Sequence, residues 1–295
     1  MRIVAAVLAA VLAAAVGFAA SEAGAQPVRV ASKTSAEQVI VGEIYAAALE
    51  AHRVKVERKL AIGGTRVAHN ALASGEIDLY PEYTGAALKN ILKEPMITDP
   101  AAVYRKVKTF YEREFDLLWL KPSGINNGAA LVVRRDTAAQ YGLATLSDLA
   151  KVSPQLKLGA GPEFADRRDG LPGLKEKYGI EFAEVMQFDA LAPRYAALTG
   201  RQIDVVSGFA TDWQIAAGKF VSLADDRNLF APYYLAPVVR METIGTYPQI
   251  EAILNKVSAL LDNGAMRDMK IRVETEKEQP RDVAAAFLRS KGIIK

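Results

Sequence analysis

Cysteine is absent from the 295 residues of this chain. A chain without cysteine has no disulfide bonds, no thiolate metal site and no cysteine that could carry a lipid anchor. Histidine is scarce as well, because only His52 and His69 occur, far apart and in segments of helical pattern. Packing on a helix face is the simpler interpretation of both. The sequence therefore predicts no metal and no other cofactor.

The motifs of common hydrolases and nucleotide-binding enzymes are missing too. The chain has no GxSxG, no HExxH, no Cys–His pair and no phosphate-binding loop. Its 37 basic and 34 acidic residues give a net charge of +3, and no basic run accompanies this small excess. Nucleic acid is therefore not an expected partner. These absences predict that the protein is not an enzyme, with an exported enzyme of two lobes as the alternative.

Long apolar runs are confined to the N-terminus. After Arg2, an alanine-rich apolar stretch covers 3–20, and Ala23-Gly24-Ala25 is a small-x-small cleavage signal. This pattern is typical of a secretory signal peptide, here 1–25, and a membrane anchor is the alternative. Because no cysteine is available for a lipid anchor, we expect the mature protein to be free in the periplasm.

The rest of the chain has the composition of a soluble protein, with 51% hydrophobic and 24% charged residues, and its length suits two domains. Short strand patterns alternate with helical patterns, which predicts an α/β protein. We expect strands at 28–31, 55–60, 77–80, 117–120, 130–133, 156–159, 184–188, 203–206, 221–223 and 231–240. We expect helices at 36–52, 99–115, 145–152, 170–178, 191–199, 248–261, 265–276 and 281–291.

Two connections divide this pattern into two lobes. A loop rich in glycine, asparagine and serine follows residue 122, and a polar turn precedes residue 231. The predicted lobes are 26–127 plus 231–295, which is discontinuous, and 128–230, which is inserted. Ala71-Leu72 before Ile77-Asp78 is echoed, at the same spacing, by Ala197-Leu198 before Ile203-Asp204; this indicates related lobes, with chance as the alternative. Two connections form a hinge, and ligand is expected between the lobes.

One stretch, IGGTRVAHNALASGEIDLYPEYTGAA at 62–87, carries the most specific local pattern. Thr65 is the expected N-cap of a helix in which Val67, Ala71 and Leu72 recur at helical spacing and which ends at Gly75. The strand that follows is expected to end at Pro81, because proline has no N–H for a ladder. Tyr83 then lies at the end of a buried strand, where open α/β sheets bind ligands. A plain βαβ unit without a ligand is the alternative.

This stretch, with Ser32-Lys33 and Glu37-Gln38 upstream, resembles substrate-binding proteins of ABC transporters for quaternary amines, of the OpuC, ProX and OsmF-like type. The resemblance continues through WLKPSGINN, DGLPGL and PYYLAPVVR, and so covers essentially the whole mature chain. Several long motifs in one order are more specific than a single short pattern.

The resemblance implies a bilobal periplasmic-binding-protein fold, type II-like, with two α/β lobes joined by a two-crossover hinge. It implies a monomer that delivers a ligand similar to glycine betaine or choline to the transmembrane subunits of an ABC permease. A binding protein that signals or scavenges without transport is the alternative.

The chemistry of such a ligand indicates which residues to look for. A quaternary ammonium has no N–H, so aromatic faces hold it by cation–π attraction, whereas a carboxylate needs a cation such as arginine. The resemblance places these roles on Lys33, Tyr83, Arg167, Phe209 and Tyr233. Arg168 is an alternative to Arg167, and Tyr234 to Tyr233, since alternation lets only one of two adjacent strand residues face the cleft. Further candidates are Thr65, Asn126 and Trp213.

The sequence departs from the family pattern at several of these places. Ala86 stands where the family often has threonine, and Ala129 lies in a segment that often contains tyrosine. Phe209 has no phenol donor, and Trp213 replaces a common glycine. The cage is therefore thinner, which predicts weak binding of a quaternary amine or a bulkier ligand. Trp213 either fills the gap or packs at the start of a helix.

Overall fold

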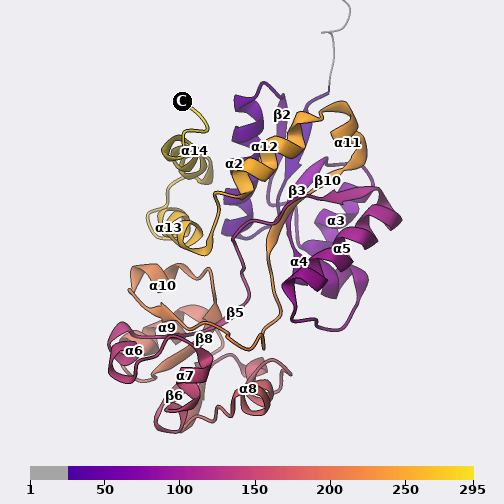
Figure 1. Cartoon of the computed structure of the whole chain (residues 1–295). Helices are drawn as coiled ribbons and strands as arrows, with labels where there is room; N and C mark the ends of the chain where they lie inside the picture. The colour runs from indigo at the N-terminus through magenta and orange to yellow at the C-terminus, as the bar shows by residue number, and fades with distance from the viewer. Residues whose placement is uncertain (1–25) are drawn as a thin grey trace, which may run out of the picture.

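The computed structural model describes residues 26–295, which form two five-stranded sheets at opposite ends of the molecule (Figure 1). The order is β2-β1-β3-β10-β4 in the first sheet and β7-β6-β8-β5-β9 in the second. The predicted signal peptide lies outside the described residues. Between residues 26 and 295, no helix combines the length and the apolarity that crossing a bilayer requires.

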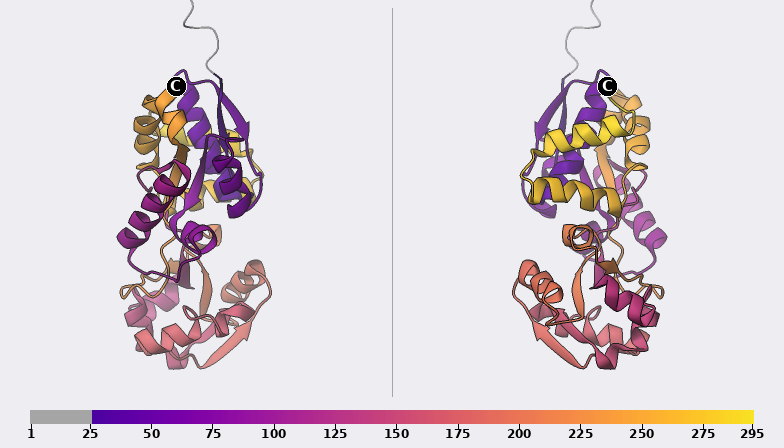
Figure 2. Two further views of the ribbon diagram at one scale, coloured as in Figure 1. Left: turned by 90° about the vertical axis from the view of Figure 1, so that its right-hand side faces the viewer. Right: turned by 90° about the vertical axis from the view of Figure 1, so that its left-hand side faces the viewer.

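The first lobe is built on the first sheet and combines the beginning and the end of the chain. Its strands are β1 (Val28–Ala31), β2 (Val56–Lys59), β3 (Leu79–Tyr83), β4 (Leu117–Trp119) and β10 (Leu235–Arg240). Its helices are α2 (Ala36–Ala51), α3 (Thr65–Ala73), α4 (Thr84–Ala87), α5 (Pro100–Phe115), α11 (Met241–Thr246), α12 (Gln249–Ser258), α13 (Asn263–Glu274) and α14 (Pro280–Ser290), with a π-helical turn η1 (Leu88–Leu92). In Figure 2 the yellow C-terminal helices lie beside the indigo N-terminal elements, and α12 and α14 pack on α2.

The second lobe is built from the middle of the chain. Its strands are β5 (Ala129–Val133), β6 (Lys157–Ala160), β7 (Glu184–Gln187), β8 (Val205–Phe209) and β9 (Val221–Ser222). Its helices are α6 (Arg135–Tyr141), α7 (Leu146–Ala150), α8 (Leu171–Tyr178), α9 (Leu191–Thr199) and α10 (Trp213–Ala217), with 3-10 turns η2 (Ser153–Gln155) and η3 (Pro162–Ala165). Separate clusters of buried apolar side chains fill the two lobes.

The two lobes repeat one arrangement. In each lobe, three parallel strands are followed by an antiparallel strand that adjoins a crossing between the lobes. This antiparallel strand is β10, beside β3, in the first lobe and β5, beside β8, in the second. Asp78 accepts a hydrogen bond from Arg29 N (2.7 Å), and Asp204 accepts one from Lys157 N (3.0 Å). Each aspartate therefore fastens the start of a neighbouring strand, so the Ile-Asp echo occupies equivalent places in both lobes.

The two crossings between the lobes lie side by side. Asn126 and Tyr234 form an antiparallel bridge, Asn127 N donates to Tyr233 O (3.1 Å), and Leu235 N donates to Ile125 O (3.0 Å). These two paired segments are the covalent connections between the lobes, and together they form a short ribbon. Tyr233 lies in this ribbon, between the lobes.

The prediction that Pro81 ends a strand is wrong. β3 continues through Pro81 to Tyr83, and in the register with β10 Pro81 lies directly opposite Pro237. Antiparallel pairs alternate between residues that exchange N–H···O bonds and residues that do not. Two facing prolines occupy a pair of the second kind, so the β3–β10 ladder needs no N–H from either of them.

Two local expectations around α3 are also wrong. Gly64 is the N-cap residue and Thr65 is the first residue of the helix, where its hydroxyl accepts a hydrogen bond from Lys33 Nζ (3.2 Å). Of the three residues of the predicted apolar face, Ala71 and Leu72 are buried, together with Ala68, whereas Val67 is 51% exposed. The end of the helix is as predicted, since Gly75 follows it with φ at +77°.

Candidate binding site

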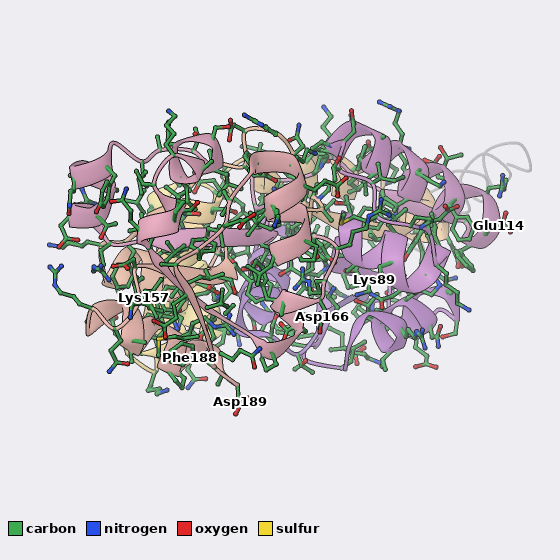
Figure 3. All side chains as sticks on the ribbon, turned by 90° about the horizontal axis from the view of Figure 1, so that it is seen from below. Lys89, Glu114, Lys157, Asp166, Phe188 and Asp189 are labelled. Carbon is green, nitrogen blue, oxygen red and sulfur yellow. The ribbon has the colours of Figure 1, made fainter. Side chains whose placement is uncertain are left out.

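A cavity of about 940 Å³ lies between the two lobes. Its first-lobe wall comes from α4, η1 and the loop that follows, and includes Leu88, Lys89 and Met96. Its second-lobe wall comes from the loop before α8 and from the end of β8. Lys89 of the first lobe and Arg167 of the second lobe line the cavity, and Figure 3, seen from below, labels Lys89 and Asp166, the residue before Arg167. The ribbon of crossings supplies Asn127, Ala231 and Tyr233.

Tyr233 is the aromatic side chain that the crossing presents to the cavity. Its N–H donates to Asn126 Oδ1 (2.8 Å), and its ring lies against Gly85, where a Cβ would come within 2.9 Å of the ring. Burial raises the pKa of Tyr233, while the nearby charge of Arg167 opposes the shift. Tyr234 is different: its backbone pairs with Thr84, and its side chain is not part of the cavity wall.

Phe209 reaches the cavity from the second lobe. It is the last residue of β8, its side chain is 46% exposed, and its N–H donates to Asp212 Oδ2 (2.8 Å). Ala129 lies directly opposite Phe209 in the β5–β8 register and also lines the cavity. The small side chain of Ala129 therefore leaves space beside the phenylalanine ring.

Tyr83 and Lys33 do not line the cavity as it stands, because both are buried behind Tyr233. The Tyr83 and Tyr233 ring centroids are 6.5 Å apart, and Lys33 Nζ lies 4.6 Å from the Tyr83 centroid. Lys33 also forms an ion pair with Glu82, which is fully buried. The Lys33 ammonium, which the resemblance assigns to a ligand carboxylate, is therefore already paired with a carboxylate of the protein. It also covers one face of the Tyr83 ring.

Two buried glutamates hold these side chains in place. Glu82 accepts hydrogen bonds from Lys33, from the Tyr80 hydroxyl (3.1 Å) and from Tyr83 N (2.6 Å). Glu37 accepts one from the Tyr83 hydroxyl. Burial raises the pKa of Glu37, while the charge of Lys270 acts in the opposite direction. Tyr83 is thus fixed from both its backbone and its hydroxyl.

Arg167 lines the cavity but is not a free cation. It makes a bidentate ion pair with Asp169, through Nε to Oδ1 (2.9 Å) and a terminal nitrogen to Oδ2 (2.6 Å). This pair raises the pKa of Arg167 further. Its side chain is 37% exposed, so water weakens the pair and a ligand carboxylate can compete for the guanidinium. Arg168 also lines the cavity, so either of the two alternative arginines can reach a ligand there.

The remaining candidates have other partners. Thr65 binds Lys33, and Asn126 pairs with Tyr233 N through its side chain and with Asn263 through its backbone N–H (2.9 Å). Trp213 is the first residue of α10 and is not part of the cavity wall. Of the two interpretations of Trp213, the structure agrees with packing at a helix start. The structure does not bring these three side chains to the cavity.

Two amide side chains stand out that sequence reasoning did not select. Gln38 is fully buried, and within residues 26–295 neither its side-chain oxygen nor its nitrogen has a hydrogen-bond partner. Asn127 lines the cavity, and its Oδ1 has no partner among the same residues. Unpaired buried amides are costly, and Asn127 is the one of the two that a ligand in the cavity can reach. The Glu37-Gln38 motif was the available signal for the first.

No group of histidine, cysteine, aspartate or glutamate suited to a metal ion occurs within residues 26–295.

Comparison with known proteins identifies a family whose model matches this chain. Residues 26–290 match the family described as the substrate-binding domain of the ABC-type glycine betaine transport system. The chain is 35% identical to a glycine-betaine-binding protein of Pseudomonas aeruginosa, over 94% of this chain and 92% of the relative. It is 36% identical to an ergothioneine transport permease/ergothioneine binding protein of Helicobacter pylori; the match covers 91% of this chain but only 48% of that longer protein.

Solved structures agree with this assignment. The chain is similar to apo YehZ from Escherichia coli, with a TM-score of 0.86 and 31% identity, over 91% of this chain and all of that one (100%). A glycine betaine/carnitine/choline ABC transporter structure gives a TM-score of 0.85 and 28% identity, over 91% of this chain and 100% of that one. These likenesses confirm the predicted bilobal periplasmic-binding-protein fold.

Proposed function

Because the chain belongs to the family of substrate-binding domains of ABC-type glycine betaine transport systems, we propose that it captures a small quaternary amine or zwitterion between its lobes. It is a substrate-binding protein of an ABC importer by family, and its relatives are transport binding proteins rather than enzymes. The partner that receives the ligand is the pair of transmembrane subunits of an ABC permease.

The observation that carries this proposal is the pair of aromatic side chains that line the cavity from different parts of the molecule. Tyr233 from the crossing and Phe209 from the second lobe both line it, and the Tyr83 ring centroid lies 6.5 Å from that of Tyr233. A trimethylammonium group between two ring faces gains ~0.5–2 kcal/mol from each, and more when water is excluded. Closure of the lobes brings these faces together around the ligand.

For the polar end of the ligand, the protein offers fewer unpaired cationic side chains than the family pattern implies. Lys33 is paired with Glu82 and Arg167 with Asp169. Of the two, Arg167 is the one that a carboxylate reaches from the cavity, with Arg168 beside it. Asn127 lines the cavity and its Oδ1 lacks a partner in residues 26–295, so we assign this acceptor to a donor group of the ligand, such as a hydroxyl. Gln38 is fully buried and does not line the cavity.

We propose the periplasm as the compartment, because the N-terminal sequence has the pattern of a signal peptide. Export through a signal peptide that is cut after Ala25 leaves a mature protein beginning at Gln26, free in the periplasm. Intact-mass measurement of the protein from a periplasmic extract tests this; a mass that retains the first 25 residues contradicts it.

A thermal-shift screen followed by calorimetry tests the proposed function. The probes are glycine betaine, choline, carnitine, ergothioneine and several amino acids without a quaternary nitrogen. Because a ligand that binds only the folded state stabilises it by RT ln(1 + [L]/Kd), the melting temperature is expected to rise with at least one quaternary amine. No shift and no heat with any of the quaternary amines would contradict the proposal.

The volume of the cavity and the space beside Ala129 favour a bulkier zwitterion as a second candidate. Ala129→Tyr decides between the two, since the new ring would stand beside Phe209 and fill that space. For a small betaine it adds a face and lowers Kd; for a bulky ligand it occludes the cavity and raises Kd.

A further inference from the structure

Besides the ribbon of crossings, a second contact joins the lobes. Helix α13 of the first lobe packs against α10 of the second lobe, and Figure 1 shows α13 directly above α10 on the side away from α4 and α8. The cavity wall, by contrast, includes Lys89 after α4 and Arg168 before α8. The lobes are therefore in contact at one side of the molecule and separated at the other.

Two cations on α13 make the polar part of this contact. Arg267 Nε donates to Ala210 O (3.0 Å), and Lys270 Nζ donates to Thr211 O (3.0 Å). Both carbonyls belong to the turn of residues 209–212, which connects β8 to α10. Hydrogen bonds from charged donors to buried acceptors are stronger than neutral ones. Two side chains of the first lobe thus donate hydrogen bonds to the backbone of a turn in the second lobe.

This turn is rigid within its own lobe. Asp212 Oδ2 accepts hydrogen bonds from Phe209 N (2.8 Å) and from the Tyr195 hydroxyl (3.0 Å). Ala210 N donates to Gly128 O (3.0 Å), at the start of the second lobe. Gly208 has no room for a side chain, since a Cβ would lie 2.6 Å from Asp212 Oδ2. Because several hydrogen bonds fix this turn, a displacement of its carbonyl groups also displaces its first residue, Phe209.

That first residue is Phe209, whose ring faces the cavity. Helix α13 also packs against α2, which carries Glu37, the acceptor of the Tyr83 hydroxyl. The charge of Lys270 lowers the pKa of Glu37 against the larger effect of burial. Helix α13 therefore contacts both the turn that ends at Phe209 in one lobe and the helix that supports Tyr83 in the other.

We propose that Arg267 and Lys270 are positioning residues for ligand capture, because they hold the 209–212 turn against the first lobe. In this role they set the orientation of the Phe209 ring relative to Tyr233, and the α13–α10 contact is the pivot that stays closed while the opposite side opens. The inference rests on the proposed function, since it concerns how the same cleft is assembled.

The test compares Arg267→Gln, Lys270→Met and the double variant with the parent protein. The double variant is expected to raise Kd for the quaternary amine that binds the parent best by about tenfold, the scale of a lost charge-assisted hydrogen bond. Lys270→Arg keeps a donor to Thr211 O and is expected to restore most of the affinity. Arg272→Gln is the matched control, because Arg272 lies on the same helix but pairs with Glu278 inside the first lobe.

Tryptophan emission supplies a second readout that needs no ligand. The chain has two tryptophans: Trp119 is 1% exposed in the first-lobe core, whereas Trp213 begins α10 and is half-buried. Loosening the α13–α10 contact is expected to shift the emission of the free protein to longer wavelength, through Trp213. Arg272→Gln is expected to leave the emission unchanged.

The outcomes separate this inference from the proposed function. If the parent binds none of the quaternary amines, the proposed function fails, and an unchanged emission in the double variant then overturns the positioning role as well. If the parent binds and the double variant melts at a lower temperature but keeps the parental Kd, the two cations only stabilise the fold and the inference is overturned. A raised Kd with shifted emission, rescued by Lys270→Arg, supports it.

Discussion

Tyr233 and Tyr234 are adjacent in the sequence but have different surroundings. Tyr233 lines the cavity and packs on Gly85, whereas Tyr234 uses its backbone to pair with Thr84 and stays outside the cavity wall. In extended backbone, successive side chains point to opposite faces, so a single residue of register decides which ring a ligand meets.

Replacing each tyrosine by alanine tests this difference. Tyr233→Ala is expected to raise Kd for the preferred quaternary amine by up to about thirtyfold, because one ring face is worth ~0.5–2 kcal/mol. Tyr234→Ala is the matched control and is expected to change Kd by less than about twofold. Calorimetry on both variants measures this, and equal losses would show that the register assignment is wrong.

Glu37 makes the stability of the protein depend on pH. Burial raises the pKa of this carboxyl above its ordinary value of 4.5, so the folded state holds its proton more tightly than the unfolded state does. The resulting stabilisation is present below the ordinary pKa and is lost as the pH rises through the raised value.

Glu37→Gln removes this titration and keeps an acceptor for the Tyr83 hydroxyl. The variant is expected to gain thermal stability relative to the parent as the pH rises from about 4 to about 7. Thermal unfolding of both proteins across that range measures the difference. A difference in melting temperature that stays constant with pH, or shrinks, would show that Glu37 is not protonated preferentially in the folded state.

The five principal candidate residues show how far single residues can be read from a sequence. Arg167, Phe209 and Tyr233 line the cavity, while Lys33 and Tyr83 lie behind it with carboxylate partners. A motif places these residues in the same neighbourhood, but it does not show that Glu82, one residue before Tyr83, points its carboxylate at Lys33. Their role in binding stays a prediction.

At the scale of elements, helix α4 and the second crossing depend on one glycine. A Cβ at Gly85 would lie 2.6 Å from Pro232 O and 2.9 Å from the Tyr233 ring, and neither the backbone nor the ring can move without displacing the crossing. Gly85 therefore allows α4 to approach the crossing closely.

Gly85→Ala is expected to destabilise the protein by about 1–3 kcal/mol, as overpacking does, and to weaken ligand binding by shifting Tyr233. Gly245→Ala in α11 is the matched control: a Cβ there meets nothing within 4 Å, and alanine favours a helix more than glycine does. Urea unfolding and calorimetry measure both effects. A Gly85→Ala protein as stable as the parent would mean that the contact yields easily.

The long helices were predictable from the sequence, whereas several of the short ones were not. The helix expected at 99–115 is α5, with Asp99 as its N-cap through a bond from Ala102 N (2.7 Å), and 36–52 corresponds to α2. Helices α6, α10 and α11 were not predicted. Each spans two turns or fewer, so too few residues repeat at helical spacing to give a pattern, and tertiary packing rather than propensity stabilises them.

At the scale of the whole molecule, the connections between the lobes determine the motion. The bridge between Asn126 and Tyr234 forms a narrow ribbon, and α13 meets α10 on one side only. An arrangement of this kind bends at the ribbon, keeps the α13–α10 contact and closes over a ligand at the opposite side.

Small-angle scattering is expected to show a smaller radius of gyration when the preferred quaternary amine is present at saturation. The physical reason is that ligand contacts from both lobes favour the closed state over the open one. The Tyr233→Ala variant at the same ligand concentration is the control and is expected to show less contraction. An unchanged radius together with heat of binding would indicate a rigid cleft.

The sequence alone determined the family, the alternation of strands and helices, and the residue types that a quaternary amine needs, because these follow from local pattern and from motifs in a fixed order. The tertiary structure decided which of those residues reach the cavity. Lys33 is neutralised by Glu82, Tyr83 is fastened by Glu37, and the 209–212 turn is held by Arg267, more than fifty positions further along the chain. Such pairings depend on distances between segments that are remote in sequence, and packing alone sets those distances.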